Sequence, residues 1–293
     1  MHTESTDPSP QINLQDWLGR TETLRDVVTA TPYAALAATL DRPAERPAAG
    51  AALPALWHWL YFLPLAPQSD IGPDGHAKRG GFLPPVSLPR RMWAGSQFQF
   101  HAPLHVGDAI ERTSTIESVS EKSGRTGRLV FVRVRHEIRA NAATMVALTE
   151  HHDIVYRDAA QPTDVAPPPQ AAPPDAVWRK DWTADDVLMF RYSALTFNGH
   201  RIHYDRRYVT EVEGYPGLVV HGPLIATLLV DLLRWQLPHA RLTRFQFKAL
   251  RPTFDINRFA VCGKPLDGGK RFHLWAQDHE GWLTMDAMAE VAV

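Results

Sequence analysis

The sequence feature that most constrains the fold is an internal repeat. FQFHAPLHVGD at residues 98–108 and FQFKALRPTFD at residues 245–255 share the frame FQF, one residue, Ala and a final Asp. The copies are separated by about half of the 293-residue chain, and an apolar, helix-like run precedes each, PALWHWLYFL in the first half and PLIATLLVDLLRWQL in the second. Because repeated units bury a shared core, the repeat predicts a duplicated fold with one continuous core.

A change of composition supports the division into halves. Residues 157–176, RDAAQPTDVAPPPQAAPPDA, are dominated by proline and alanine, which favours an extended spacer over a packed core. We therefore predict an N-terminal unit at residues 1–156, a linker at 157–176 and a C-terminal unit at 177–293.

Each half is predicted to combine a helix with antiparallel strands. In GRLVFVRVRHEI, valines alternate with polar residues as in a half-buried strand, and MVALTEHHDIVYR follows. Turn signals separate the later strand candidates, RLTRFQFKAL, RFAVCGKPL, KRFHLWAQD and WLTMDAMAEVAV. The apolar runs ALPALWHWLYFLPLA and GLVVHGPLIATLLVDLL are interrupted before the roughly 18 residues of a membrane span, so both are predicted to be buried helices. The fold class is α+β, with sheets curled around central helices.

Charge and cysteine content exclude several classes of protein. The 31 basic and 32 acidic residues give a net charge of −1 and are mixed along the chain, which indicates no nucleic-acid or membrane partner. The single cysteine, Cys262, has no internal disulfide partner, and the N-terminus lacks the basic and apolar regions of a signal peptide. These features predict a reducing, cytoplasmic setting.

The segment TFNGHRIHYD at residues 196–205 concentrates polar groups directly after a helix-like run, DDVLMFRYSAL. His200 and His203 have an HxxH spacing, but no further ligand cluster stands at a zinc spacing, so no metal is predicted. Asn198 and Gly199 also form a good turn dipeptide, and Asp205 is expected to cap the following helix.

Two long segments resemble a known family. YSALTFNGHRIHYDRRYVTEVEGYPGLVVHGPLIATLL is similar to the hydratase signature of MaoC-type hotdog enzymes, Ser-Gly-Asp-x-Asn-Pro-x-His-x-Asp, followed by a helix that opens with His-Gly. DGHAKRGGFLPPVSLPRRMWAGSQFQF resembles the N-terminal hotdog of a double-hotdog branch. That branch includes mesaconyl-C4-CoA, 3-methylfumaryl-CoA and itaconyl-CoA hydratases and hydroxyacyl-thioester dehydratases. The resemblance covers residues 10–293 and implies a double hotdog.

The resemblance also implies site residues. The catalytic histidine of the family falls on His203, and its acidic partner falls on Asn198, whose amide cannot take a proton. His203 is then the sole general acid/base, while Asn198 positions the water or the thioester carbonyl. At the His-Gly step, His221 and Gly222 are implied to bind substrate, with the Gly222 N–H at the positive end of a helix receiving charge from the thioester oxygen.

Basic residues give less specific signals. Arg201 stands where the single-hotdog enzymes usually carry proline, and it either holds a second carboxylate of the acyl group or forms a surface ion pair. The first half has a basic loop that either contacts the phosphates of coenzyme A or is only solvated. Its basic residues are Lys78, Arg79, Arg90 and Arg91, and Arg79 and Arg90 are the candidates for substrate binding.

The predicted function is hydration of a short, dicarboxylic α,β-unsaturated acyl-CoA, with no cofactor beyond the coenzyme A of the substrate. The N-terminal unit lacks the catalytic motif and is expected to be a degenerate hotdog that closes the cleft. Three alternatives remain open: a fatty-acyl 3-hydroxyacyl-thioester dehydratase, a hotdog thioesterase, and a non-catalytic acyl-thioester binding protein. Exposed sheet edges favour a homodimer over a monomer.

Overall fold

The computed structural model describes residues 13–42, 47–124, 127–159 and 168–292. Ten strands form one antiparallel sheet in the order β1-β3-β4-β5-β2-β7-β10-β9-β8-β6. The N-terminal half contributes β1 (Thr21–Val27), β2 (Arg90–Phe100), β3 (Ala109–Gly124), β4 (Gly127–Ala140) and β5 (Leu148–Arg157). The C-terminal half contributes β6 (Trp178–Trp182), β7 (Arg241–Ala249), β8 (Phe259–Leu266), β9 (Arg271–Gln277) and β10 (Leu283–Ala292).

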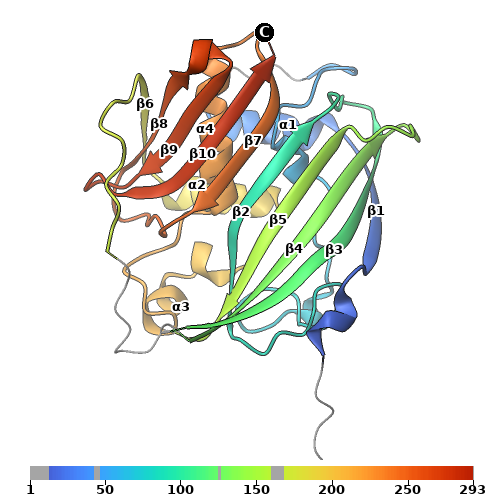
Figure 1. Cartoon of the computed structure of the whole chain (residues 1–293), viewed down its shortest axis with the longest axis vertical. Helices are drawn as coiled ribbons and strands as arrows, with labels where there is room; N and C mark the ends of the chain where they lie inside the picture. Colours follow the sequence, from blue (N-terminus) through green and yellow to red (C-terminus); the bar gives the residue numbers. More distant parts are fainter. Residues whose placement is uncertain (1–12, 43–46, 125–126, 160–167, 293) are drawn as a thin grey trace, which may run out of the picture.

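The two halves have the same topology, and the sequence repeat joins them. The strand order β1-β3-β4-β5-β2 of the first half is repeated as β6-β8-β9-β10-β7 in the second. The two FQF segments meet where β2 pairs with β7, with Phe98 opposite Phe245 and the preceding Gln97 opposite Gln246. Phe98 and Phe245 occupy the same position of the repeat and are direct partners, as expected where a pseudo-two-fold axis crosses the sheet (Figure 1).

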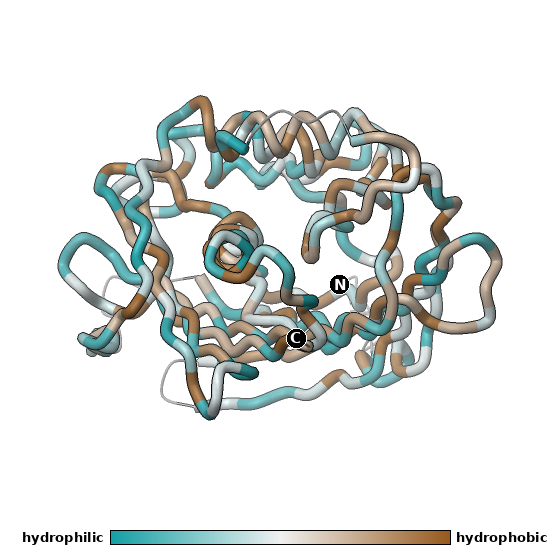
Figure 2. The backbone as a smooth tube through the Cα atoms, turned by 90° about the horizontal axis from the view of Figure 1, so that it is seen from above, coloured by the Kyte–Doolittle hydropathy of each residue, from teal (hydrophilic) through white to brown (hydrophobic). Residues whose placement is uncertain are grey.

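The helices lie on the concave side of this sheet, which Figure 2 shows as a curved layer along one side of the molecule. The long helix α4 (Gly222–Gln236) packs against β6, β8 and β9, and every residue from Leu224 to Leu233 is buried. Shorter helices are α1 (Ala30–Thr39), α2 (Asp186–Leu195) and α3 (Arg206–Glu211). One hydrophobic core spans both halves and includes Phe98 and Leu148 from the first with Leu228 and Phe245 from the second. The predicted continuous core is confirmed.

The prediction of a buried helix in ALPALWHWLYFLPLA was wrong. Only a 3-10 turn, Trp57–Leu60, forms there, because Pro54 and Pro64 bracket the segment and Leu56 and Phe62 have left-handed backbone angles, with φ of 69° and 55°. An α-helix cannot continue through such residues. The first half therefore lacks a long central helix of its own, and this segment and α1 pack into the shared core instead.

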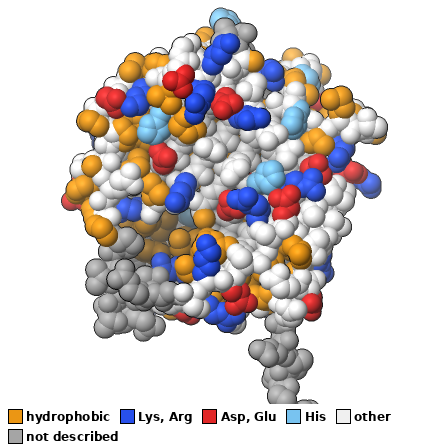
Figure 3. All heavy atoms as spheres, in the orientation of Figure 1, with side chains coloured by type: hydrophobic (Ala, Val, Ile, Leu, Met, Phe, Trp, Pro, Cys, Tyr) orange, Lys and Arg blue, Asp and Glu red, His pale blue; other side chains and the backbone are white. Residues whose placement is uncertain are grey.

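Other sequence predictions have mixed outcomes. The strand candidates of both halves correspond to β4, β5 and β7–β10, and GPLIATLLVDLL forms α4. The predicted linker falls partly on residues 160–167, outside the described residues, and its domain boundaries remain a prediction. No helix in the described part of the chain is long and apolar enough to cross a membrane. On the face in Figure 3, basic and acidic side chains are interspersed.

Candidate active site

A compact turn between α2 and α3 presents the polar motif. Asp185 caps α2 by accepting the backbone N–H of Leu188 at 2.8 Å. After α2, the Asn198 Oδ1 accepts the N–H of His200 at 3.0 Å, and a short 3-10 turn covers Arg201–His203. Asp205 then caps α3 by accepting the N–H of Tyr208 at 2.9 Å, which confirms the capping prediction.

His203 has the geometry of a neutral base. Its ring is 8% exposed, and Nδ1–H donates to the Val219 carbonyl at 2.6 Å, which leaves the lone pair on Nε2. Burial lowers the His203 pKa to about 4, although the hydrogen bond to Val219 works in the opposite direction. His203 is therefore unprotonated at neutral pH and can accept a proton through Nε2.

His221 lies behind this ring. It is fully buried, it stacks on His203 with ring centroids 3.8 Å apart, and its Nε2 pairs with the Ser193 hydroxyl at 2.8 Å. Burial, followed by the neighbouring histidines, holds its pKa well below the usual value. In this arrangement His221 fixes the plane of the His203 ring, and direct contact of His221 with substrate remains a prediction.

Gly222 opens α4 directly after His221. Its N–H donates to no backbone carbonyl within the described residues, and a Cβ built on it would meet no atom within 4 Å. A backbone donor at the positive end of a 15-residue helix thus has no backbone acceptor among the described residues, and there is room beside the Gly222 Cα, which suits an oxyanion site.

The side chain of Asn198 has donors available in this arrangement. Its Oδ1 is engaged by the His200 N–H, so the amide group has its two N–H donors left for a ligand. Asn198 can hold the oxygen of a thioester or of water, but it cannot receive a proton.

The predicted basic site residues already have partners. Arg201 pairs with Asp205 at 2.6 Å and donates to the Pro73 carbonyl at 3.0 Å. Of the two roles predicted for Arg201, the structure therefore contains the ion pair. Arg79 donates to three backbone carbonyls of its own loop, those of Val86, Leu88 and Pro89. Arg90 links β2 to the other half through the Glu213 carbonyl at 2.9 Å and carboxylate at 3.3 Å. Contacts of these arginines with substrate remain predictions.

Sequence reasoning missed Asp74 and His76 of the N-terminal half. The His76 ring lies 4.0 Å from that of His200, which lies 5.5 Å from that of His203. Asp74, His76 and His200 also have potential metal-ligating atoms within 4.8 Å of one another. Because these residues come from different halves, no ligand spacing in the sequence could reveal the cluster. In the sequence, the segment DGHAKRGG carries only two signals, its similarity to the N-terminal hotdog of the family and its basic residues.

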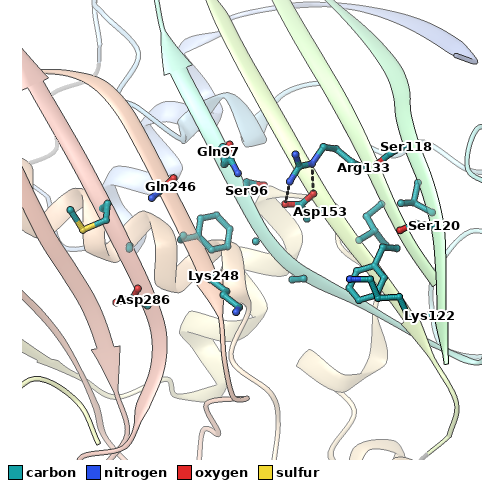
Figure 4. A pocket seen from close by; sticks show the side chains of 18 residues that line it. Ser96, Gln97, Ser118, Ser120, Lys122, Arg133, Asp153, Gln246, Lys248 and Asp286 are labelled. Atoms are coloured by element: carbon teal, nitrogen blue, oxygen red, sulfur yellow. Dashed lines mark hydrogen bonds and ion pairs between the residues drawn. The ribbon is translucent and has the colours of Figure 1, made fainter. Parts of the chain in front are cut away.

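A surface cavity of about 550 Å³ lies elsewhere. Figure 4 shows it on the sheet where the halves meet, with Gln97 from β2, Gln246 and Lys248 from β7, and the Arg133–Asp153 ion pair nearby. None of the site residues named above lines it. This cavity is therefore separate from the histidine cluster.

The continuous sheet, the duplicated strand order and the turn that leads into α4 define a double hotdog protein of the MaoC-like class. Among solved structures, a MaoC-like dehydratase from Phytophthora capsici matches with a TM-score of 0.68 at 13% identity, over 96% of this chain and 98% of that one. A Mycobacterium tuberculosis protein described as having a double hotdog fold matches with a TM-score of 0.56 at 12% identity, over 94% and 96% of the two chains.

Sequence comparison identifies the family. The profile described as hydroxyacyl-thioester dehydratase type 2 matches residues 56–255. The mesaconyl-C(4)-CoA hydratase of Chloroflexus aurantiacus is 46% identical over 277 residues, which cover 94% of this chain and 96% of that protein. The chain belongs to the hydroxyacyl-thioester dehydratase type 2 family.

Proposed function

We propose that this protein adds water to the double bond of a short, dicarboxylic α,β-unsaturated acyl-CoA, of the mesaconyl-C4-CoA or itaconyl-CoA kind. The observation that carries the proposal is the pairing of a neutral base, His203, with the free Gly222 N–H at the start of α4. The two groups are adjacent because the His203 ring stacks on His221. The similarity to a mesaconyl-C(4)-CoA hydratase supports this substrate class.

The His203 Nε2 removes a proton from water while the oxygen of that water attacks the β-carbon. Such proton transfer contributes about 10²–10⁴-fold to rate. The Val219 carbonyl, which accepts the Nδ1–H, keeps the proton on the far nitrogen of the ring. The His203 Nε2 can therefore accept a proton from water without a change of tautomer.

The electrons of the double bond move to the thioester oxygen, where the Gly222 N–H and the positive end of α4 stabilise the enolate. One such donor contributes about 3 kcal/mol to transition-state stabilisation. The amide of Asn198 supplies further donors. The thioester itself delocalises the charge, so the route uses no cofactor beyond the coenzyme A of the substrate.

The free carboxylate of the acyl group requires a cation. Arg201 would have to give up Asp205 to bind it. Arg91 at the start of β2 is a further candidate: it forms no salt bridge within residues 13–42, 47–124, 127–159 and 168–292, it lies beside Tyr156, and its charge contributes to lowering the pKa values of His76 and His200. Arg91→Gln is expected to raise KM for a dicarboxylic thioester and to leave KM for crotonyl-CoA unchanged.

Turnover of mesaconyl-C4-CoA, itaconyl-CoA and crotonyl-CoA, measured side by side, tests the proposal. Hydration of a dicarboxylic thioester in preference to crotonyl-CoA supports it. Preference for crotonyl-CoA or longer acyl chains favours the dehydratase alternative, which the family description also supports. Tight binding of a thioester without turnover would favour the alternative of a non-catalytic binding protein, in which Asn198 replaces the catalytic acid.

We further propose a cytoplasmic homodimer. The strands β1 and β6 are the two edges of the sheet, and unpaired edges favour association between copies of a chain. Light scattering on the purified protein tests the oligomeric state.

A further inference from the structure

A loop of the N-terminal half is built against the catalytic turn of the C-terminal half. A Cβ on Gly75 would lie 1.8 Å from the Gly199 carbonyl oxygen, and a Cβ on Gly199 would lie 2.8 Å from that of Gly75. The Arg201 N–H donates to the Asp74 carbonyl at 2.9 Å. The two backbones are thus in direct contact, which only glycine permits at either position.

This loop brings an imidazole–carboxylate pair to the histidine cluster. The His76 Nδ1–H donates to the Asp74 Oδ2 at 3.0 Å, and the His76 backbone N–H donates to the Asp74 Oδ1 at 3.0 Å. Burial opposes ionisation of Asp74, but the hydrogen bonds from His76 hold its pKa well below the usual range. The pair therefore consists of a carboxylate and a neutral imidazole whose Nε2 has a free lone pair.

We propose that Asp74 and His76 form a second hydrogen-bond acceptor for the attacking water and replace the carboxylate that Asn198 cannot provide. This inference rests on the proposed hydration. The attacking water donates one O–H to the His203 Nε2 and the other to the His76 Nε2, so its lone pair points at the β-carbon. The carboxylate of Asp74 fixes the tautomer and plane of the His76 ring, as buried acids do for catalytic histidines.

His203 and His76 account for both protons of the attacking water. One O–H bond of the water breaks as the C–O bond forms, and the proton moves to the His203 Nε2. The electrons of the double bond move to the thioester oxygen and then return to form a C–H bond at the α-carbon with the proton from His203. His76 retains its hydrogen bond to the other O–H, which stays on the product as its hydroxyl.

The local charges favour this role over metal binding by Asp74, His76 and His200. After burial, Arg91 and Arg79 contribute to lowering the His76 pKa, against the pull of Asp74. The same positive field opposes a divalent cation, for which the cluster offers a single carboxylate. The His76 Nδ1 and the Asp74 Oδ2 are also engaged in the Asp74–His76 hydrogen bond.

The test compares His76→Ala, His76→Gln and Asp74→Asn with a matched control, His273→Ala, which breaks a His–Asp pair of 2.6 Å between β9 and β10. With the thioester that the wild type hydrates, we expect kcat to fall about 100-fold in both His76 variants, with KM and the melting temperature little changed. Added imidazole should partly restore His76→Ala, because the His76 side chain is 23% exposed. Asp74→Asn keeps an oxygen for the His76 N–H and should lose about tenfold in kcat. The control should retain wild-type kcat.

The outcomes separate this inference from the proposed function. A wild type that hydrates the thioester while both His76 variants retain most of its kcat overturns the inference alone. So does a His76→Ala variant that imidazole does not restore, combined with unchanged kcat in Asp74→Asn. Activity lost on dialysis against a chelator and recovered with Zn²⁺ would assign the cluster to a metal and also overturn it. A wild type that hydrates no thioester overturns both proposals.

Discussion

The substitution Gly75→Ala tests whether contact between the two halves sets the catalytic geometry. Gly75 has a φ of +90°, and the added Cβ would lie 1.8 Å from the Gly199 carbonyl oxygen and 3.2 Å from the Arg201 nitrogen. An ordinary contact needs about 3.5 Å, so the loop and the turn must separate by roughly 1.7 Å. A displacement of about 1 Å at a catalytic site can reduce rate 100-fold, which corresponds to about 2.7 kcal/mol of activation free energy.

Gly107→Ala is the matched control for this change. Gly107 has a φ of +105°, but no atom lies within 4 Å of its added Cβ, so it has the same kind of backbone strain without the clash. Both variants should lose about 1–2 kcal/mol of stability from a left-handed alanine, and Gly75→Ala should lose more because of its clash with Gly199; each loss is seen as a fall in the melting temperature. Only Gly75→Ala should also lose about 100-fold in kcat for thioester hydration. Equal kcat in the two variants would refute the claim that this contact positions the catalytic turn.

Three further changes test the site and the core. His203→Gln should lower kcat by at least about 100-fold, measured by the loss of enoyl-thioester absorbance. Near-normal activity of this variant would exclude His203 as the base. Gly222→Ala adds a methyl group that meets no other atom of the protein, so the melting temperature should not change. If the thioester binds against the start of α4, the same methyl group should clash with it and lower kcat/KM. Because Arg42 pairs with the buried Asp231 of α4, Arg42→Met should cost about 3 kcal/mol in chemical denaturation.

The lowered pKa of His203 predicts a pH dependence. The unfolded chain binds a proton at this residue below about pH 6.5, whereas the folded protein does not until about pH 4. Stability should therefore be independent of this group above pH 6.5 and should fall as the pH drops from 6.5 towards 4. The acid limb of kcat/KM should lie near pH 4 for the same reason, and a limb near pH 6.5 would contradict the buried, neutral state of His203.

Features encoded by local pattern were predictable from the sequence. The alternation in GRLVFVRVRHEI corresponds to β4, and the apolar stretch after Pro223 corresponds to α4, because period and composition determine such elements over short distances. The same reasoning failed for PALWHWLYFL, where hydrophobicity is equally strong but the left-handed angles at Leu56 and Phe62 prevent a helix. Apolar content predicted burial in both segments, and only the backbone angles distinguished their conformations.

The approach of His76 to His200 could not be predicted in this way, since it depends on how the two halves dock. Their relation follows from the repeat: Phe98 pairs with Phe245 at the centre of the sheet, so β2 covers the edge that β7 would otherwise expose. The second half retains the long helix and His203, while the first retains the sheet and supplies Asp74 and His76 through a loop fixed by Gly75 and Gly199. An isolated C-terminal half would expose the edge of β7 and lose the imidazole–carboxylate pair. In the proposed mechanism the duplication serves chemistry as well as burial: the first half lacks the catalytic motif but provides, through His76, the hydrogen-bond acceptor for water that replaces the missing carboxylate at Asn198.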